Sequence, residues 1–433
     1  MNRLADQSTS NLRRYLKLVP YSEVERRIEE ALHEYSVPTE FISTQDSLNR
    51  ICAQQVKATR DLPERPLVAM DGYAVNSRDT QRATLSNNVS LLVRGALLPG
   101  ANYLPRIRNG YTCYTATGAP LPPGTDAVAR VEEVRLGADR ILLSHPIAEW
   151  ENVFAKGEDY SKGSLLMEKD QIINSAGVAL LISLRKRQVK VYRVPKVAVI
   201  SIGDELAPFN SSLDKKTANN YSNMVCGFAS DLGVRAEPLG VCPDDPKRIA
   251  ASVKSALAKY DAVITIGGSS VGKKDVTTDS LSSIPGASVI FHGVAIVPIR
   301  PAGLLTIKGK PVIILPANAI SVATSFFMIA KPVLNVISGL KFGGRSCAIR
   351  AKSTESLQND RTMSALYLVT LERSVGGGCA FKTLAWGSNL ISNLARSNGF
   401  VQLDRDQKVE KNEELRVNLF GASEMSRIRN AIY

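Results

Sequence analysis

The stretch DAVITIGGSSVGKKD, residues 261–275, joins an unbroken apolar run to a glycine-rich turn that ends in an acid. An apolar run of this length, bounded by turn residues, is typical of a buried strand. Two further runs, KVAVISI (196–202) and PVIILP (311–316), have the same character, and helical patterns lie between the strands at 223–233 and 244–260. Strands that alternate with helices predict a largely parallel sheet covered by helices.

The turn that ends this stretch comes close to a phosphate-binding P-loop. Its spacing, Gly267-x-x-x-x-Gly272-Lys273, fits up to the last position, where Lys274 replaces the Ser or Thr that binds magnesium. The missing hydroxyl argues against a nucleotide triphosphatase. The backbone N–H groups of a glycine-rich turn can still bind an anion, and the carboxylate of Asp275 can bind magnesium. We therefore interpret the turn as an anion-binding loop beside an acid.

Two other loops follow strands of the same predicted sheet. GDEL (203–206) places Asp204 and Glu205 at the end of one strand, and PANAIS (316–321) follows another. Ligands bind at the carboxyl ends of strands in such sheets, so acids from two loops can form a magnesium or oxyanion site. The competing interpretation is that one of the acids caps the next helix.

Two helical patterns lie outside this α/β segment. Residues 21–33 have apolar residues at helical spacing, with Ser22 as the expected N-cap. A second helical core spans 173–184. The helix at 244–260 has the strongest start signal, with Asp245 as N-cap and Pro246 as first helical residue.

The remaining segments are rich in β patterns. Short runs separated by Gly/Pro turns predict a small all-β module over 60–150, and within it AMDGYAV (69–75) favours a turn at Asp71-Gly72. From about residue 341 a β-rich tail follows, with a hairpin turn expected at 376–378.

Composition restricts the class of protein. The chain has 54 Lys and Arg against 41 Asp and Glu, and this net charge of +13 favours anionic partners, or else a solvated surface rich in lysine. Six widely spaced cysteines without a CxxC pair predict reduced thiols in a cytosolic protein, and three histidines without metal-ligand spacing argue against zinc. The N-terminus lacks the apolar region of a signal peptide. The most apolar stretch, 319–330, is too short to span a bilayer and predicts a buried helix.

Seven segments, in this order, resemble one family, the molybdopterin molybdenumtransferases, which include the E domain of gephyrin. The resemblance runs from about residue 18 to 420 with matching spacing. The segments are AMDGYAV (69–75), TGAPLPPGTDAV (117–128), KGEDYSKG (156–163), VPKVAVISIGDEL (194–206), ITIGGSSVGKKD (264–275), GKPVIILPANAIS (309–321) and GSNLISNLARSNGF (387–400).

The resemblance implies a multidomain α/β plus β protein. Its parts are a discontinuous helical domain for dimerisation (18–58 and 148–190), a β-rich module (59–147), an α/β molybdopterin-binding domain with a mainly parallel sheet (191–340), and a C-terminal β-barrel (341–433). The resemblance also implies a cytoplasmic homodimer with each active site between the α/β domain of one subunit and the β module of the other. It leaves room for contacts with other cofactor-biosynthesis proteins and implies no nucleic-acid or membrane partner.

The implied reaction takes adenylylated molybdopterin and molybdate, or tungstate, releases AMP and leaves the metal on the dithiolene, with Mg²⁺ as cofactor. A basic surface suits such a polyanionic substrate. By resemblance the catalytic acids are Asp71, Glu205 and Asp275, and the metal ligands are Asp159, Glu205 and Asp275. The substrate-binding positions are Thr117, Gly267, Gly268, Ser270, Gly272, Arg300, Asn318 and Ser321.

Several positions depart from the family pattern. Tyr221 replaces an acid, Val297 replaces a lysine, and Ala317 and Ala319 replace a glycine and a proline. Arg300 keeps a cation that can hold phosphate in a bidentate manner. Because each lost charge contact in a desolvated site costs on the order of 2–4 kcal/mol, an alternative is a catalytically impaired paralogue that binds molybdopterin or acts as a scaffold.

Overall fold

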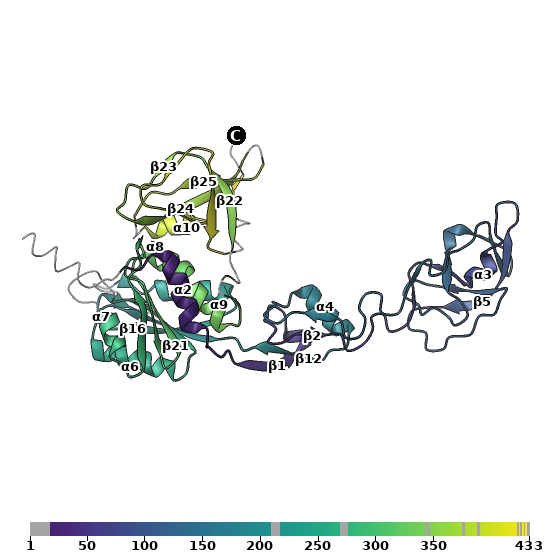
Figure 1. Ribbon diagram of the computed structural model, residues 1–433, viewed down its shortest axis with the longest axis horizontal. Helices are drawn as coiled ribbons and strands as arrows, with labels where there is room; N and C mark the ends of the chain where they lie inside the picture. The colour runs from purple at the N-terminus through teal and green to yellow at the C-terminus, as the bar shows by residue number, and fades with distance from the viewer. Residues whose placement is uncertain are drawn as a thin grey trace, which may run out of the picture. The chain divides into compact units, whose positions relative to one another are not determined.

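The computed structural model describes residues 18–208, 217–268, 276–341, 343, 347–374, 377–387, 390–421, 424, 427, 429 and 430. The chain forms two compact units, which Figure 1 shows: one contains the residues up to Glu40 and from Tyr192 onward, and the other runs from Phe41 to Val191. The bounds of the four domains expected from the sequence stay predictions.

A six-stranded sheet forms the α/β part of the first unit. Four neighbouring strands are parallel, and two antiparallel strands complete one edge. In spatial order they are β16 (Arg235–Cys242), β13 (Lys196–Ile202), β17 (Ala262–Gly267), β21 (Lys310–Leu315), β20 (Gly303–Ile307) and β18 (Ala287–His292). The predicted, mainly parallel sheet is confirmed.

Side chains of the central strands alternate between two cores. Val197 and Val199 of β13 pack in one core, while Ala198 and Ile200 pack in the other. Each fully buried Val or Ile contributes about 1.5–3 kcal/mol relative to an exposed one. Helices α2 (Tyr21–Leu32), α5 (Tyr221–Asp231), α8 (Ala319–Ser325) and α9 (Lys331–Ile337) cover the first face, and α6 (Pro246–Leu257) and α7 (Val276–Ser282) cover the second (Figure 1).

The helix starts show where local sequence signals succeed. Asp245 caps α6 as predicted, because its carboxylate accepts a hydrogen bond from the backbone N–H of Arg248. The expected cap Ser22 is wrong: α2 begins at Tyr21 after Pro20, and Ser22 lies inside its first turn. Proline already has the φ angle of a helix start. Helix α2 packs in the first core of the α/β part.

A continuous helix runs from Ala319 to Ile337. It contains α8, a π-helical segment η3 (Phe326–Ala330) and α9. Within the part of the chain that the structure describes, it is the one helix long and apolar enough to cross a membrane, yet 83% of that stretch is buried inside the protein. The predicted buried helix therefore exists and extends past Lys331-Pro332.

A closed five-stranded barrel follows. Its strands pair in a ring, because β24 contacts both β25 and β26. Around the ring they are β24 (Ser364–Arg373), β25 (Cys379–Thr383), β22 (Ala348–Ser353), β28 (Glu414–Leu419) and β26 (Gly399–Leu403). Short elements complete this region: β23 (Leu357–Gln358), α10 (Ile391–Arg396), β27 (Lys408–Val409), β29 (Arg429–Asn430), and β19 (Ile296–Val297), which pairs with β24 from the α/β part. Of the expected hairpin turn, Gly377 and Gly378 have positive φ, and residue 376 lies outside the described residues.

The second unit contains a six-stranded sheet of its own. In spatial order its strands are β7 (Ala127–Arg130), β4 (Gly72–Val75), β6 (Tyr111–Thr115), β5 (Val89–Leu97), β9 (Arg140–Leu143) and β8 (Val134–Leu136). Two-stranded pairs join β1 (Thr39–Ser43) to β12 (Gln188–Tyr192), β3 (Leu67–Val68) to β10 (Val153–Phe154), and β2 (Val56–Lys57) to β11 (Leu165–Met167). The helices are η1 (Thr44–Asp46), α3 (Ser77–Thr80), η2 (Val131–Glu133) and α4 (Ser175–Ser183).

The expected turn at Asp71-Gly72 is wrong. Gly72 begins β4, a buried strand between β6 and β7. Glycine is needed here because a Cβ atom would collide with the carbonyl oxygen of Ala129 on the neighbouring strand. A close approach of two backbones, rather than a turn, accounts for this glycine.

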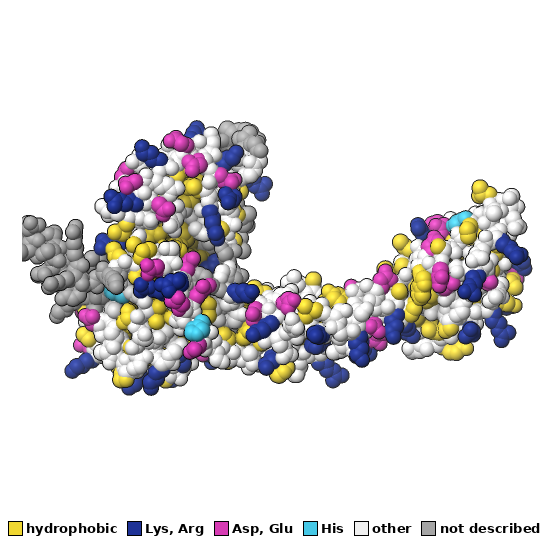
Figure 2. Space-filling view, in the orientation of Figure 1, with side chains coloured by type: hydrophobic (Ala, Val, Ile, Leu, Met, Phe, Trp, Pro, Cys, Tyr) yellow, Lys and Arg dark blue, Asp and Glu magenta, His cyan; other side chains and the backbone are white. Residues whose placement is uncertain are grey.

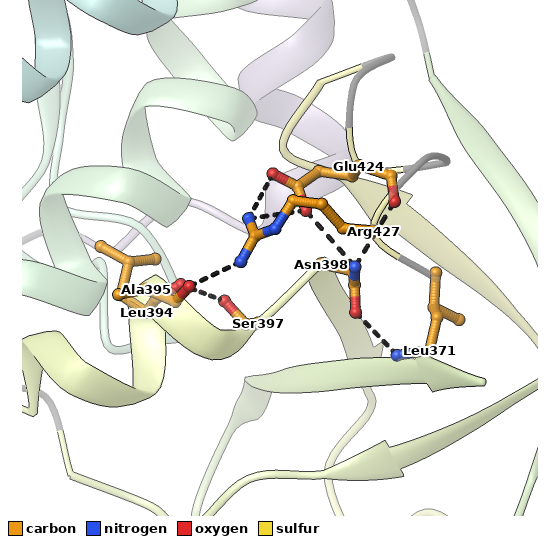
Figure 3. Close-up of polar contacts among 7 residues, drawn as sticks. All are labelled: Leu371, Leu394, Ala395, Ser397, Asn398, Glu424 and Arg427. Atoms are coloured by element: carbon orange, nitrogen blue, oxygen red, sulfur yellow. Dashed lines mark hydrogen bonds and ion pairs between the residues drawn. The ribbon is translucent and has the colours of Figure 1, made fainter. Parts of the chain in front are cut away.

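A buried polar cluster joins the end of the chain to the barrel (Figure 3). The Asn398 carboxamide accepts a hydrogen bond from the backbone N–H of Leu371 at 2.8 Å and faces Glu424, which is 9% exposed. Arg427 binds both carboxylate oxygens of Glu424 at 2.8 and 2.9 Å and donates to the carbonyl of Ala395 at 2.7 Å. Asn398 therefore links β24 to the segment that carries Glu424.

We expect Arg427→Met to lower the free energy of unfolding by about 2 kcal/mol, because it leaves the nearly buried Glu424 carboxylate without its cation. Urea unfolding followed by circular dichroism measures this change. Arg405→Met is the matched control, since Arg405 and Asp406 form an exposed pair worth about 0–1 kcal/mol. Equal losses in the two variants would contradict the role given to the buried pair.

Candidate functional site

A pocket of about 720 Å³ lies where three parallel strands end. The register pairs Ile202 with Gly267 and Ile266 with Leu315, so the loops after β13, β17 and β21 begin in one row. Residues of all three loops line the pocket, together with the segment from Val297 to Pro301. Four of the predicted site residues meet here: Glu205, Gly268, Arg300 and Asn318.

Arg300 is the cation of this pocket. A tight turn presents it, because its carbonyl accepts a hydrogen bond from the N–H of Val294 and the N–H of Ala302 donates to Ile299. Its Nε atom is buried without a hydrogen-bond partner, and no described residue forms an ion pair with its guanidinium. An unpaired guanidinium in a concave pocket is suited to bind phosphate or another oxyanion.

The glycines of the β17 loop shape the wall opposite. Gly267 and Gly268 have φ angles of 92° and 63°, which glycine adopts at little cost. A Cβ atom on Gly267 would collide with the carbonyl oxygen of Ile202, and one on Gly268 would collide with the Thr277 hydroxyl. The predicted residues Ser270, Gly272 and Asp275, and the lysines beside them, lie outside the described residues.

Acids line the pocket near the end of β13. Glu205 and Asp244 both contribute to the lining, and Asp204 does not cap a helix: its carboxylate accepts from the N–H of Asp244, while the Asp244 carboxylate accepts from the N–H of Asp204, both at 3.3 Å. No sequence motif marked Asp244, which precedes the helix cap Asp245. The part of the chain that the structure describes holds no group of three His, Cys, Asp or Glu side chains arranged to bind a metal.

Two departures from the family pattern contact each other beside the pocket. Burial raises the pKa of Tyr221, and the backbone of Ala319 lies close enough to the Tyr221 hydroxyl to act on that pKa in the opposite direction. Ala319 follows the pocket residues Ala317 and Asn318 and is the first residue of α8. A proline at 319 has no N–H to donate, so Tyr221 and Ala319 form a matched pair. The predicted residue Ser321 is buried inside α8 rather than in the pocket lining, and its hydroxyl has no hydrogen-bond partner.

In the second unit, Asp71 and Thr117 are brought together as predicted. The Asp71 carboxylate accepts hydrogen bonds from the backbone N–H and the hydroxyl of Thr117, at 2.7 and 2.8 Å. These bonds hold the pKa of Asp71 below its usual range, with the backbone bond as the larger cause. The carboxylate is exposed, ionised and fixed in orientation.

Asp159 is placed differently. Its backbone N–H donates to the carbonyl of Leu62, and its exposed carboxylate contacts neither Asp71 nor a cation among the described residues. A different acid, Asp61, contacts this loop. Its carboxylate accepts a hydrogen bond from the backbone N–H of Lys162 at 2.8 Å and forms an ion pair with Lys156 at 3.4 Å. Sequence reasoning missed Asp61, because its partners lie about a hundred residues further along the chain.

The barrel supplies a neighbouring feature that no local motif signalled. A narrow hollow lined by Trp386 shares Pro298 with the main pocket. The guanidinium of Arg361 stacks on the Trp386 ring at 3.6 Å, and its Nε atom is buried without a hydrogen-bond partner. The face shown in Figure 2 carries lysines and arginines interspersed with acids.

Comparisons with known proteins agree over most of the chain. The family profile described as the MoeA N-terminal region (domain I and II) matches residues 19–184, and the profile described as a probable molybdopterin binding domain matches residues 198–336. A Staphylococcus aureus protein named molybdopterin molybdenumtransferase is 31% identical over 74% of this chain and 76% of its own length. A Methanocaldococcus jannaschii protein assigned to molybdopterin biosynthesis is 30% identical over 93% of this chain and 98% of its own.

A solved structure supports the same likeness. The molybdopterin biosynthesis MoeA protein from Pyrococcus horikoshii superposes with a TM-score of 0.80 at 28% identity, covering 94% of this chain and 100% of the other.

We expect Thr117→Val to raise the pKa of Asp71 toward the ordinary aspartate value of about 3.9, because the carboxylate loses one of its two donors. A depressed folded-state pKa favours the folded state above the unfolded pKa, and this contribution disappears as pH falls through the folded value. Carbon-13 NMR titration of the Asp71 carboxyl measures the shift. Thr125→Val is the control, since its hydroxyl donates to the carbonyl of Pro122 instead; an unchanged Asp71 titration in Thr117→Val would contradict the assignment.

If the Tyr221 hydroxyl accepts a hydrogen bond from the Ala319 N–H, Tyr221→Phe should destabilise the protein by about 1 kcal/mol, because that N–H loses its acceptor. Ala319→Pro removes that N–H at a first helical position that accepts proline. In the Ala319→Pro background, Tyr221→Phe should therefore cost close to nothing, and a double-mutant cycle from urea unfolding measures the coupling. Additive effects of the two substitutions would show that the pair does not interact.

Proposed function

Because the chain belongs to the MoeA family of molybdenum cofactor biosynthesis proteins, we propose that it is a molybdopterin molybdenumtransferase. Its substrates are adenylylated molybdopterin and molybdate or tungstate, and its products are the metal-loaded cofactor and AMP. One observation carries the proposal: a single pocket combines an unpaired guanidinium, Arg300, with the acids Glu205 and Asp244. Such a pocket can hold an anionic substrate and a hard cation side by side.

Arg300 is the group that binds anionic oxygens in this scheme. Its delocalised charge and fixed donor geometry suit the paired oxygens of a phosphate. The substrate phosphates and molybdate are all anions and repel one another. A cation placed between them offsets this repulsion. Gly267 and Gly268 let the backbone come close to the ligand, because a larger residue at either position would displace the wall of the pocket.

The donor set near the end of β13 fits Mg²⁺. Carboxylate oxygens are its preferred protein ligands, and Mg²⁺ commonly binds through one or two carboxylates together with substrate phosphates. Glu205 and Asp244 would hold it here, and Asp275 would add a further carboxylate. When bound, the cation would neutralise charge on the phosphate oxygens.

The chain's own acids have separate tasks. Glu205 folds back over Gly203, since a Cβ built on that glycine would lie 2.7 Å from both carboxylate oxygens. Removing the Glu205 side-chain charge would therefore alter the pocket wall as well as its field. Asp71, ionised and oriented by Thr117, is suited to orient a substrate donor or hold a proton acceptor in place.

A cytoplasmic homodimer accounts for an acid on the surface of the second unit. Two large apolar residues near Asp71 are exposed: Met70 by 50% and Leu98 by 59%. Exposed apolar side chains beside a fixed carboxylate are typical of a surface that meets another subunit. In the proposed dimer this edge of one subunit completes the pocket of the other.

The alternative, an impaired scaffold protein, gains no support from the departures that suggested it. The backbone of Ala319 lies near the Tyr221 hydroxyl, so these two changes are compatible with an ordered pocket. Arg300 keeps a cation in the segment where Val297 lost one. The relatives described above bear names of biosynthetic enzymes, which also favours the transferase.

AMP release tests the proposal. Purified protein is mixed with adenylylated molybdopterin, molybdate and Mg²⁺, and AMP is quantified by chromatography. We expect Arg300→Met to lower kcat/KM about 100-fold or more, because a single preorganised charge contact in a pocket is worth that factor. The kcat/KM of Arg300→Lys should fall between those of the parent protein and Arg300→Met, because lysine keeps the charge without the bidentate geometry.

Lys254→Met is the matched control, because Lys254 is an exposed lysine of α6 outside the pocket lining. Its activity should equal that of the parent protein. Absence of AMP release by an intact dimer, verified by light scattering, would exclude the transferase. Full activity in Arg300→Met would remove Arg300 from the site.

A further inference from the structure

A second pocket, of about 390 Å³, lies between the continuous helix Ala319–Ile337 and the barrel. Helix α2 contributes Tyr21 and Glu25, α9 contributes Lys331, and β28 contributes Arg416. None of these residues belongs to the main pocket, whose lining comes from the strand ends and the segment Val297–Pro301. A cavity of this size accommodates a small metabolite.

Lys331 is an unusual residue for its place in the fold. It is the single charged residue of the helix from Ala319 to Ile337. Burial lowers the pKa of Lys331, which means that its surroundings disfavour the ammonium form. An apolar residue could fill the same space without the free-energy cost of desolvating an ammonium group.

No described carboxylate compensates this charge. Lys331 forms no ion pair or hydrogen bond with the described residues. Its Nζ atom lies over the ring of Phe327, 5.5 Å from the ring centre. The acid of the pocket, Glu25, is exposed and engages the hydroxyl of Tyr21, which also donates to the carbonyl of Met328.

The rest of the lining suits an anion. Arg416 adds a second cation, close enough to act on Tyr21, and the carboxamides of Asn335 and Asn418 add polar groups. Two cations, Lys331 and Arg416, therefore stand against one carboxylate, Glu25, in the lining. A bound anion would supply the missing partner of Lys331 and offset its desolvation.

We propose that this pocket is a second anion-binding site, distinct from the main pocket, that takes a small phosphate- or carboxylate-bearing molecule with Lys331 as its counter-ion. The ligand is defined by this shared chemistry, because phosphate and carboxylate oxygens meet the same donors. The site does not depend on the proposed transferase activity, since none of its residues lines the main pocket.

Titration calorimetry with inorganic phosphate, and separately with citrate, tests the proposal at constant ionic strength with chloride as the reference anion. The full-length protein is used in four variants: Arg300→Met, Lys331→Met, Lys331→Arg and the surface control Lys254→Met. Arg300→Met removes binding at the main pocket, so the remaining heat reports the second site.

In the Arg300→Met background we expect one of the two anions to bind with a stoichiometry of one per chain. Adding Lys331→Met should weaken this binding about tenfold or more, the value of a lost charge-assisted hydrogen bond. Lys331→Arg should retain it and Lys254→Met should leave it unchanged. Circular dichroism verifies that the variants are folded.

Two results would overturn the proposal. One is the absence of phosphate and citrate binding in folded Arg300→Met protein, which would leave the main pocket as the single anion site. The other is equal binding by the Lys331→Met and Lys254→Met variants. Absence of AMP release by the parent protein, with this binding retained, would reject the transferase and leave the second site intact.

Discussion

The register of three parallel strands is the constraint on which the site depends. Because Ile202 pairs with Gly267 and Ile266 with Leu315, the chain leaves β13, β17 and β21 at one level of the sheet. Three loops separated by many residues in sequence therefore share one pocket, and a shift of a strand by one residue would also exchange its buried faces. Both apolar cores enforce this register, because Val197 and Val199 belong to one core and Ala198 and Ile200 to the other.

The fold was largely predictable because its signals are local. Apolar runs marked β13, β17 and β21, and the pair Asp245-Pro246 marked the start of α6. Local signals failed where a distant partner decides the conformation. Gly72 looked like a turn residue, yet its lack of a side chain serves the approach of Ala129, more than fifty residues away. The cap at Ser22 failed because Pro20 starts the helix one residue earlier.

The candidate site was predictable to the extent that its residues lie in strand-end loops. Glu205, Gly268 and Asn318 follow strands directly, and Arg300 was found only through the family resemblance. Asp61, Asp244 and Arg361 were missed, because each owes its position to contacts with remote segments. The interaction between Tyr221 and Ala319 was also hidden, since two substitutions that look unfavourable one by one are complementary once the fold brings them together.

The π-helical segment Phe326–Ala330 sets the angular relation between the two halves of the core helix. A π turn contains one more residue than an α turn, so the residues after it are rotated by about 100° relative to an uninterrupted α-helix. The π-helical segment therefore determines how far α9, which carries Lys331, is rotated about the helix axis relative to α8, which follows the strand-end loop. Deleting one residue from this segment would turn α9 about its axis while leaving α8 in place, and so exchange which of its side chains face the sheet.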